Sequence, residues 1–148
     1  MFTRKDNSEI KSPGPTVLMF YFSAHWCPPC RKLTPLLVEF YQELRKENID
    51  SSEFDVVFIS SDRSQEQFDD YYEEMPWAHL KLDDSDEKMR LSRLFSIATL
   101  PSLIAVNSSG AKIDVNSRQL ITDWALADKN SRGPAAAILA TIIAASIK

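Results

Sequence analysis

The sequence predicts an α/β fold of three layers, an α/β/α sandwich in which helices cover both faces of a mixed central sheet. Three observations lead to this prediction. Apolar runs without polar alternation indicate strands that are buried on both faces. Segments with apolar residues three and four positions apart alternate with these runs and indicate helices. A turn-forming stretch at 107–110 (NSSG) follows the third apolar run and indicates a hairpin.

The first part of the chain predicts a β-α-β unit. Apolar runs at 17–22 (VLMFYF) and 54–60 (FDVVFIS) are typical of buried strands. The segment between them has an apolar stripe at helical spacing, made of Leu33, Leu36, Leu37, Phe40, Tyr41 and Leu44. Such a stripe packs a helix against the sheet, so we expect the two strands to be parallel.

Two capping signals predict shorter helices further along. Ser64 is followed three residues later by Gln67, and Asp84 is followed three residues later by Glu87. This spacing lets a side-chain oxygen accept a hydrogen bond from the first turn of a helix. We therefore expect one helix to begin after Ser64 and another after Asp84.

The last part predicts a hairpin and a terminal helix. A strand at 102–106 (SLIAV) and a shorter one near 112–115 flank the turn at 107–110, and their antiparallel pairing would make the sheet mixed. Apolar residues recur at helical spacing over 135–147. A helix of that length is about 20 Å long, which is too short for a hydrocarbon core of about 30 Å. We expect it to dock by one face, and a membrane-surface or partner-binding role is the alternative.

Length and composition indicate one domain over residues 1–148, with a flexible N-terminal segment at 1–14 and a C-terminal helix at 134–148. The 17 Lys and Arg against 21 Asp and Glu give a net charge of −4, and the basic residues are scattered. Nucleic acid is therefore excluded as a direct ligand, because an acidic surface repels phosphates. The polar N-terminus is unlike a signal or transit peptide, so we expect a cytoplasmic or nuclear location. We also expect a monomer that has no membrane partner.

Both cysteines of the chain, Cys27 and Cys30, lie in the stretch HWCPPC. A zinc site would need two more ligands, and His25 lies too close to Cys27 to complete a tetrahedron easily. A structural disulfide would close a loop of only four residues, which constrains the unfolded chain very little. A redox dithiol is the interpretation that the spacing favours, with no metal and no bound cofactor.

The position of the pair supports this chemistry, because it falls between a buried strand and an amphipathic helix. Unpaired N–H groups and the macrodipole at a helix start favour a negative charge, so we expect Cys27 to attack as a thiolate. Cys30, one turn further, would resolve the mixed disulfide. Pro28 and Pro29 suit the first helical turn and stiffen it. Trp26 is a packing residue or, as we prefer, a platform for a substrate.

These residues make the chain resemble the thioredoxin superfamily, and more narrowly its nucleoredoxin and tryparedoxin branch. The likeness covers about 17–116 and rests on three segments: 21–31 (YFSAHWCPPCR), 61–64 (SDRS) and 74–77 (EMPW). It implies a thioredoxin-like fold and thiol–disulfide exchange by Cys27 and Cys30. It also implies that the Leu100-Pro101 bond is cis and faces the dithiol, where the backbone before Pro101 pairs with a substrate strand. Without the resemblance, Pro101 is interpreted only as a strand-entry residue.

Several positions depart from thioredoxins proper or from the branch. Tyr21 occupies the place where thioredoxins proper have a buried carboxylate, although the branch also has tyrosine there. A phenol is neutral at pH 7, so a buried general base is absent, and Tyr21 fits a core role as well as a catalytic one. The stretch 78–81 (AHLK) replaces an apolar stretch ending in proline, and His79 is interpreted as a solvated loop residue. After Asn116 the likeness fades.

The predicted function is that of a thiol–disulfide oxidoreductase acting as a protein-disulfide reductase. Its partners would be a disulfide-containing protein substrate and a reducing dithiol or reductase that resets the pair. The alternative is a redox-gated binding module of nucleoredoxin type that regulates a signalling partner. Acidic clusters near 69–74 and 83–87 lack the glycine and the oxygen spacing of a calcium loop, so they are interpreted as solvated faces.

Overall fold

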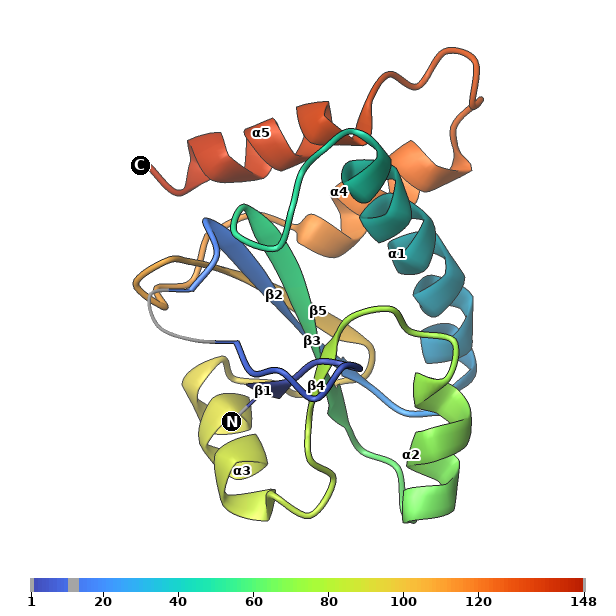
Figure 1. Cartoon of the computed structure of the whole chain (residues 1–148), viewed down its shortest axis with the longest axis vertical. Coiled ribbons are helices and arrows are strands. Elements are labelled where there is room, and N and C mark those ends of the chain that lie inside the picture. Colours follow the sequence, from blue (N-terminus) through green and yellow to red (C-terminus); the bar gives the residue numbers. More distant parts are fainter. Residues whose placement is uncertain (1, 11–13, 148) are drawn as a thin grey trace.

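The computed structural model describes residues 2–10 and 14–147, and over these residues five strands form one mixed sheet (Figure 1). The strands are β1 (Phe2–Thr3), β2 (Val17–Ser23), β3 (Phe54–Ser60), β4 (Ala78–Leu80) and β5 (Ser102–Asn107). Their order in the sheet is β1-β4-β3-β2-β5. The three central strands run parallel, and β1 and β5 pair antiparallel at the two edges. The prediction of a mixed sheet is confirmed.

Helices cover both faces of the sheet, which confirms the three-layer prediction. They are α1 (Pro28–Lys46), α2 (Gln65–Tyr72), α3 (Ser85–Leu94), α4 (Ser117–Leu126) and α5 (Ala135–Ala145). Apolar residues of α1, α2, α4 and α5 share one buried cluster on one face. Leu91 of α3 and Phe95 at its end pack on the opposite face.

The β-α-β unit forms as predicted, because β2 and β3 are buried along their whole length and α1 lies between them in the chain. Leu37, Phe40 and Leu44 of α1 are fully buried against the sheet. In the parallel register, Ser23 of β2 lies beside Ser60 of β3. The loops that follow these two strands therefore leave the same edge of the sheet.

Both predicted caps are confirmed. The Ser64 hydroxyl accepts a hydrogen bond of 3.2 Å from the N–H of Gln67, at the start of α2. The Asp84 carboxylate accepts one of 3.3 Å from the N–H of Glu87, at the start of α3. Each cap satisfies a backbone donor that has no partner within its helix.

The predicted hairpin is only partly present. After β5 the chain returns to the sheet in a single bridge between Val106 and Lys112, and no strand forms at 112–115. The N–H of Ile113 donates to the carbonyl of Ala105, and the Ile113 side chain is buried in the core. The chain then turns away because Asn116 caps α4, which the sequence did not predict.

The N-terminal segment also differs from the prediction, since part of the stretch 1–14 expected to be flexible belongs to the sheet. Phe2 and Thr3 form β1, which pairs with Leu80 and His79 of β4. Residues 1 and 11–13 lie outside the described residues. These two strands are too short to leave a periodic pattern in the sequence.

At the C-terminus, α5 docks on α1 and α4 through Ala135, Leu139 and Ile142, which are buried. The Ile147 side chain, also part of the apolar spacing, is exposed. Among the helices of the described residues, none has the length and apolar character needed to cross a membrane.

Candidate active site

The dithiol lies where β2 gives way to α1. Cys27 is the N-cap of α1, and its carbonyl accepts the helix's first backbone hydrogen bond from Arg31, at 3.1 Å. Pro28 and Pro29 occupy the first two helical positions, where no N–H is needed. Cys30 lies three positions after Cys27, one turn into the helix. The helix therefore begins at the position that the sequence predicted.

The two sulfurs differ in exposure, and burial shifts the pKa of Cys30. Cys27 is 6% exposed and Cys30 is fully buried, and neither is in a disulfide. Burial raises the pKa of the Cys30 thiol to about 11, to which the Cys27 side chain also contributes, while the Ser23 hydroxyl acts in the opposite direction. Cys30 is therefore protonated near neutral pH. Cys27 keeps a small exposed area, and Cys30 keeps none.

The Leu100-Pro101 bond faces Cys27 and is cis, as the family resemblance implied. The thiol of Cys27 lies 3.9 Å from the carbonyl oxygen of Leu100, and the two residues pack together with Ala24 and Cys30. A hollow of about 520 Å³ opens beside this contact. Trp26 and Cys27 line it together with the segment 97–100.

Trp26 is held in a fixed position beside the hollow. Its indole N–H donates a hydrogen bond of 3.0 Å to the carbonyl of Ser61, in the loop after β3. The guanidinium of Arg63 lies over its ring, 4.9 Å from the centroid. The ring remains 43% exposed and forms one wall of the hollow.

Asp62 fixes the loop that precedes Cys27. One oxygen of its buried carboxylate accepts a hydrogen bond of 2.7 Å from the N–H of His25. The other accepts one of 2.7 Å from the hydroxyl of Ser60. Asp62 belongs to the segment 61–64 that contributed to the family resemblance, but no role was predicted for it. Its hydrogen-bond partner His25 lies 37 positions away in the sequence, so no local pattern connects the two residues.

A network of buried hydroxyl groups lies behind Cys30. The phenol of Tyr21 donates to the carbonyl of Cys30 at 3.1 Å and is hydrogen-bonded to Thr34 at 2.7 Å. Tyr71 of α2 joins Thr34 to Ser23, which lies 2.7 Å from its phenol oxygen. Burial raises the pKa of Tyr21 above its usual range, so Tyr21 is neutral and helps to hold the first turn of α1.

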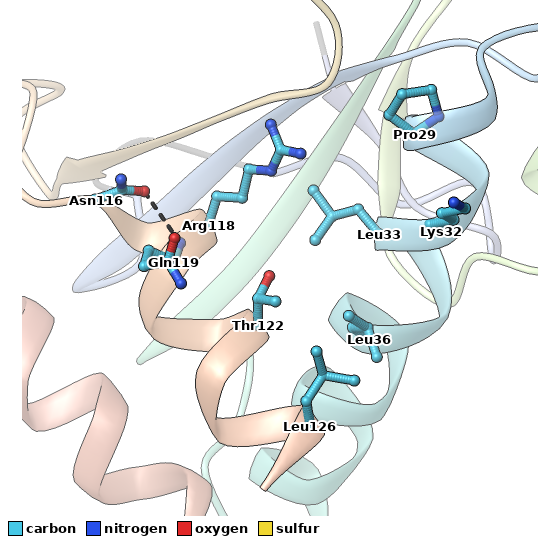
Figure 2. Close-up of a pocket in the computed structure, with 9 residues that line it drawn as sticks. All are labelled: Pro29, Lys32, Leu33, Leu36, Asn116, Arg118, Gln119, Thr122 and Leu126. Carbon is cyan, nitrogen blue, oxygen red and sulfur yellow. Dashed lines mark hydrogen bonds between the residues drawn. The ribbon is translucent and has the colours of Figure 1, made fainter.

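Pro29 faces a second hollow, away from Trp26 and Leu100. A groove of about 440 Å³ begins at Pro29 and runs between α1 and α4 (Figure 2). The side chains of Lys32 and Arg118 approach it from the two helices, and apolar residues line its far part. Pro101 lines a third hollow, and Pro28 is exposed. The predicted site residues therefore surround the dithiol without sharing one cavity.

The sequence model of the thioredoxin-like family matches residues 14–112. The chain belongs to the thioredoxin-like family. This thioredoxin-like domain is 45% identical over 108 residues to probable nucleoredoxin 1 of Arabidopsis thaliana, which covers 73% of the chain and 18% of that protein. It is 40% identical over 111 residues to tryparedoxin of Trypanosoma brucei brucei, which covers 74% of each.

Solved structures agree with this assignment. Tryparedoxin II from C. fasciculata superposes with a TM-score of 0.69 at 38% identity, over 78% of this chain and 77% of that one. Tryparedoxin I from Leishmania major gives a TM-score of 0.73 at 28% identity, over 88% and 89%. The resemblance to the nucleoredoxin and tryparedoxin branch is confirmed. The chain spans about a fifth of the length of the nucleoredoxins that it matches.

His79 lies outside the active site of this thioredoxin-like domain. It belongs to β4, is half-buried, and packs against the rings of Phe68 and Tyr72. The interpretation as a solvated loop residue is therefore wrong, and burial lowers the pKa of its imidazole. Within residues 2–10 and 14–147, no group of three or more His, Cys, Asp or Glu side chains could hold a metal ion.

Proposed function

We propose that this domain is a protein-disulfide reductase that uses Cys27 and Cys30. The observation that carries the proposal is the arrangement of the two sulfurs. Cys27 lies at the start of α1 opposite the cis Leu100-Pro101 bond, and Cys30 lies buried one turn behind it. This arrangement supports attack by Cys27 and resolution of the mixed disulfide by Cys30.

The reaction proceeds in two exchanges. The Cys27 thiolate attacks one sulfur of the substrate disulfide, and the other substrate sulfur leaves as a thiolate that takes up a proton. Cys30 then loses its proton and attacks the sulfur of Cys27, which releases the second substrate thiol. The substrate gains two electrons and two protons, and the domain is left with a Cys27–Cys30 disulfide.

Trp26, Pro28, Pro29, Leu100 and Pro101 are the residues that we assign to substrate contact. Trp26 and Leu100 support this role because they line the hollow beside Cys27. A reducing dithiol or a reductase must return the domain to the dithiol state. One related structure is tryparedoxin II complexed with glutathionylspermidine, and a low-molecular-weight thiol is therefore one candidate class of donor.

The test uses a defined protein disulfide and a trapping variant. Wild-type protein at substoichiometric concentration should accelerate the reduction of insulin by dithiothreitol, and Cys27→Ser should not. Cys30→Ser should accumulate a mixed disulfide with insulin on Cys27, which dithiothreitol releases. Failure of wild-type protein to accelerate reduction, together with no mixed disulfide in Cys30→Ser, would contradict the proposal.

A second candidate is a redox-gated binding module. The groove between α1 and α4 favours it, because Pro29 of the dithiol motif lines one end (Figure 2). A change at the dithiol could therefore alter a surface that binds a partner. Noncovalent binding that persists in Cys27→Ser and is lost when the wild-type dithiol is oxidised would support this function. Binding that requires the Cys27 sulfur supports the reductase instead.

A further inference from the structure

We infer that Arg63 makes this site select disulfides that carry a carboxylate close to a half-cystine. The inference rests on the proposed reductase function and names the substrate class of the same site. It depends on the place of Arg63 beside Trp26, on the absence of a carboxylate partner for it within the described chain, and on the exposure of its side chain.

The contact with Trp26 places the Arg63 cation near the reacting sulfur. The guanidinium lies 4.9 Å from the centroid of the Trp26 ring, and Trp26 and Cys27 line the same hollow. A guanidinium stacked on an aromatic face keeps its planar set of N–H donors available for a carboxylate. The stacking also restricts the side chain, so less conformational entropy is lost when a substrate binds.

The Arg63 cation has no carboxylate partner within residues 2–10 and 14–147. Ion pairs in this part of the chain involve other basic residues, and the recorded hydrogen bond of Arg63 is from its backbone N–H to Gln67. The neighbouring carboxylate, Asp62, is buried and accepts hydrogen bonds from His25 and Ser60. The Arg63 side chain is exposed and available to a ligand.

A second basic residue, Lys88, lies on α3, the helix that contributes Ser92 to the hollow. Lys88 lies one helical turn before Ser92. Lys88 is half-buried, and burial lowers the pKa of its ammonium group, while the charge of Asp62 acts in the opposite direction. Asp62 is buried, whereas Arg63 is exposed, so Arg63 is the charge beside Trp26 that a substrate can contact.

An acidic residue near the substrate half-cystine matches this arrangement. An extended peptide advances about 3.3–3.6 Å per residue, so a carboxylate one to three positions from a cysteine bound at Cys27 can approach Arg63. Charge-assisted hydrogen bonds to a guanidinium fork would orient the peptide along the hollow. Glutathione disulfide carries carboxylates as well and presents the same chemistry in a small molecule.

The test measures single-turnover rates, because these need no electron donor. Reduced protein is mixed with an excess of a cyclic peptide disulfide flanked by glutamates, the same peptide with glutamines, or glutathione disulfide. At low ionic strength we expect the glutamate peptide to react about threefold to fivefold faster than the glutamine peptide, the size expected for one exposed ion pair. The preference should shrink as salt is added.

Variants assign the preference to Arg63. Arg63→Gln should bring the ratio of the two peptide rates close to one, and Arg63→Lys should retain part of the preference. Lys129→Gln removes the same charge from the exposed loop between α4 and α5 and should leave the ratio unchanged. The loss of rate in Arg63→Gln is then compared between the glutamate peptide and glutathione disulfide. A larger loss for the peptide assigns the site to protein substrates. A larger loss for glutathione disulfide assigns it to the small disulfide.

Two results would overturn the inference. Equal rates for both peptides with wild-type protein would show that the site does not distinguish a charged peptide from a neutral one. An equal loss of rate for both peptides in Arg63→Gln would show that Arg63 only holds Trp26. In either case, the reductase function would still be supported if wild-type protein reacts with the disulfides and Cys27→Ser does not. If wild-type protein reacts with none of the three disulfides, the proposed function itself fails.

Discussion

At the residue scale, one helical turn separates two cysteines with different chemistry. Cys27 reaches the surface at the N-terminus of α1, and Cys30 is fully enclosed by the sheet edge and the hydroxyl network behind it. Burial opposes ionisation because a thiolate loses hydration in the interior. In the proposed reaction, Cys27 therefore attacks first, and Cys30 reacts only after the substrate has been captured.

We expect alkylation to separate the two thiols. With a pKa of about 11, only about one Cys30 in a thousand is a thiolate at pH 8. Iodoacetamide at pH 7–8 should therefore modify wild-type protein and Cys30→Ser at similar rates, and Cys27→Ser at least about tenfold more slowly. The residual rate of Cys27→Ser should increase with pH as Cys30 ionises. Mass spectrometry of timed samples measures both rates.

The opposite order of reactivity would contradict this assignment. If Cys27→Ser reacted as fast as Cys30→Ser at pH 7, the buried sulfur would be the more nucleophilic one. The roles of Cys27 and Cys30 in the proposed reaction would then have to be exchanged.

At the element scale, the first turn of the C-terminal helix α5 is capped by a side chain from the end of another helix. The carboxylate of Glu47, at the C-terminal end of α1, accepts hydrogen bonds of 2.9 Å from the N–H groups of both Ala135 and Ala136. Pro134, the N-cap residue, has no side-chain cap of its own. Glu47 therefore supplies the cap that α5 lacks, and this contact holds α5 on α1.

We expect Glu47→Ala to loosen α5 without unfolding the domain. The loss of a cap reduces the free energy of unfolding by about 0.5–2 kcal/mol, which urea denaturation can measure. Hydrogen exchange should become faster at the amides of Leu139 and Ile142 before it changes in β2 and β3. Glu43→Ala is a matched control, because the recorded ion pair of Glu43 is an exposed one with Lys46. An equal effect of both variants would contradict the capping role.

At the scale of the whole molecule, the N-terminal strand completes the sheet and supplies a charge to its interior. Arg4, directly after β1, donates a hydrogen bond of 2.8 Å to the carboxylate of Asp55, which is 1% exposed in the central strand β3. Tyr41 and Arg45 of α1 approach the same carboxylate. Burial raises the pKa of Asp55 above its usual range in spite of these partners.

We expect Arg4→Ala to destabilise the fold in a pH-dependent way. A raised pKa in the folded state means that ionised Asp55 costs stability, and this cost appears as pH rises through that pKa. Without Arg4 the ion is less well compensated, so the loss should be about 1–3 kcal/mol at pH 7. The loss should vanish as the pH falls and Asp55 becomes protonated. Denaturation curves from pH 3 to pH 7 measure this.

A double-mutant cycle with Asp55→Asn provides the control. In that background Arg4→Ala should cost less and show no such pH dependence, because no carboxylate is left to ionise. A loss that is equal at every pH and in both backgrounds would show that Arg4 acts only through the backbone of the N-terminal segment.

The sequence alone was sufficient for the features that depend on neighbouring residues. The apolar runs of β2 and β3, the stripe of α1 and the caps at Ser64 and Asp84 are local patterns, and each was confirmed. The dithiol motif at the start of α1 belongs to the same class. The cis bond before Pro101 was expected only through the family resemblance, because nothing in its neighbours requires it.

Tertiary structure alone decided the features in which distant residues meet. The sequence did not show that Asp62 would hold the loop before Cys27, that Arg63 would lie over Trp26, or that Glu47 would cap α5. It also did not show that β1 would complete the sheet. Periodicity and caps reflect forces within a few residues, whereas these contacts form only when packing of the core brings separate segments together.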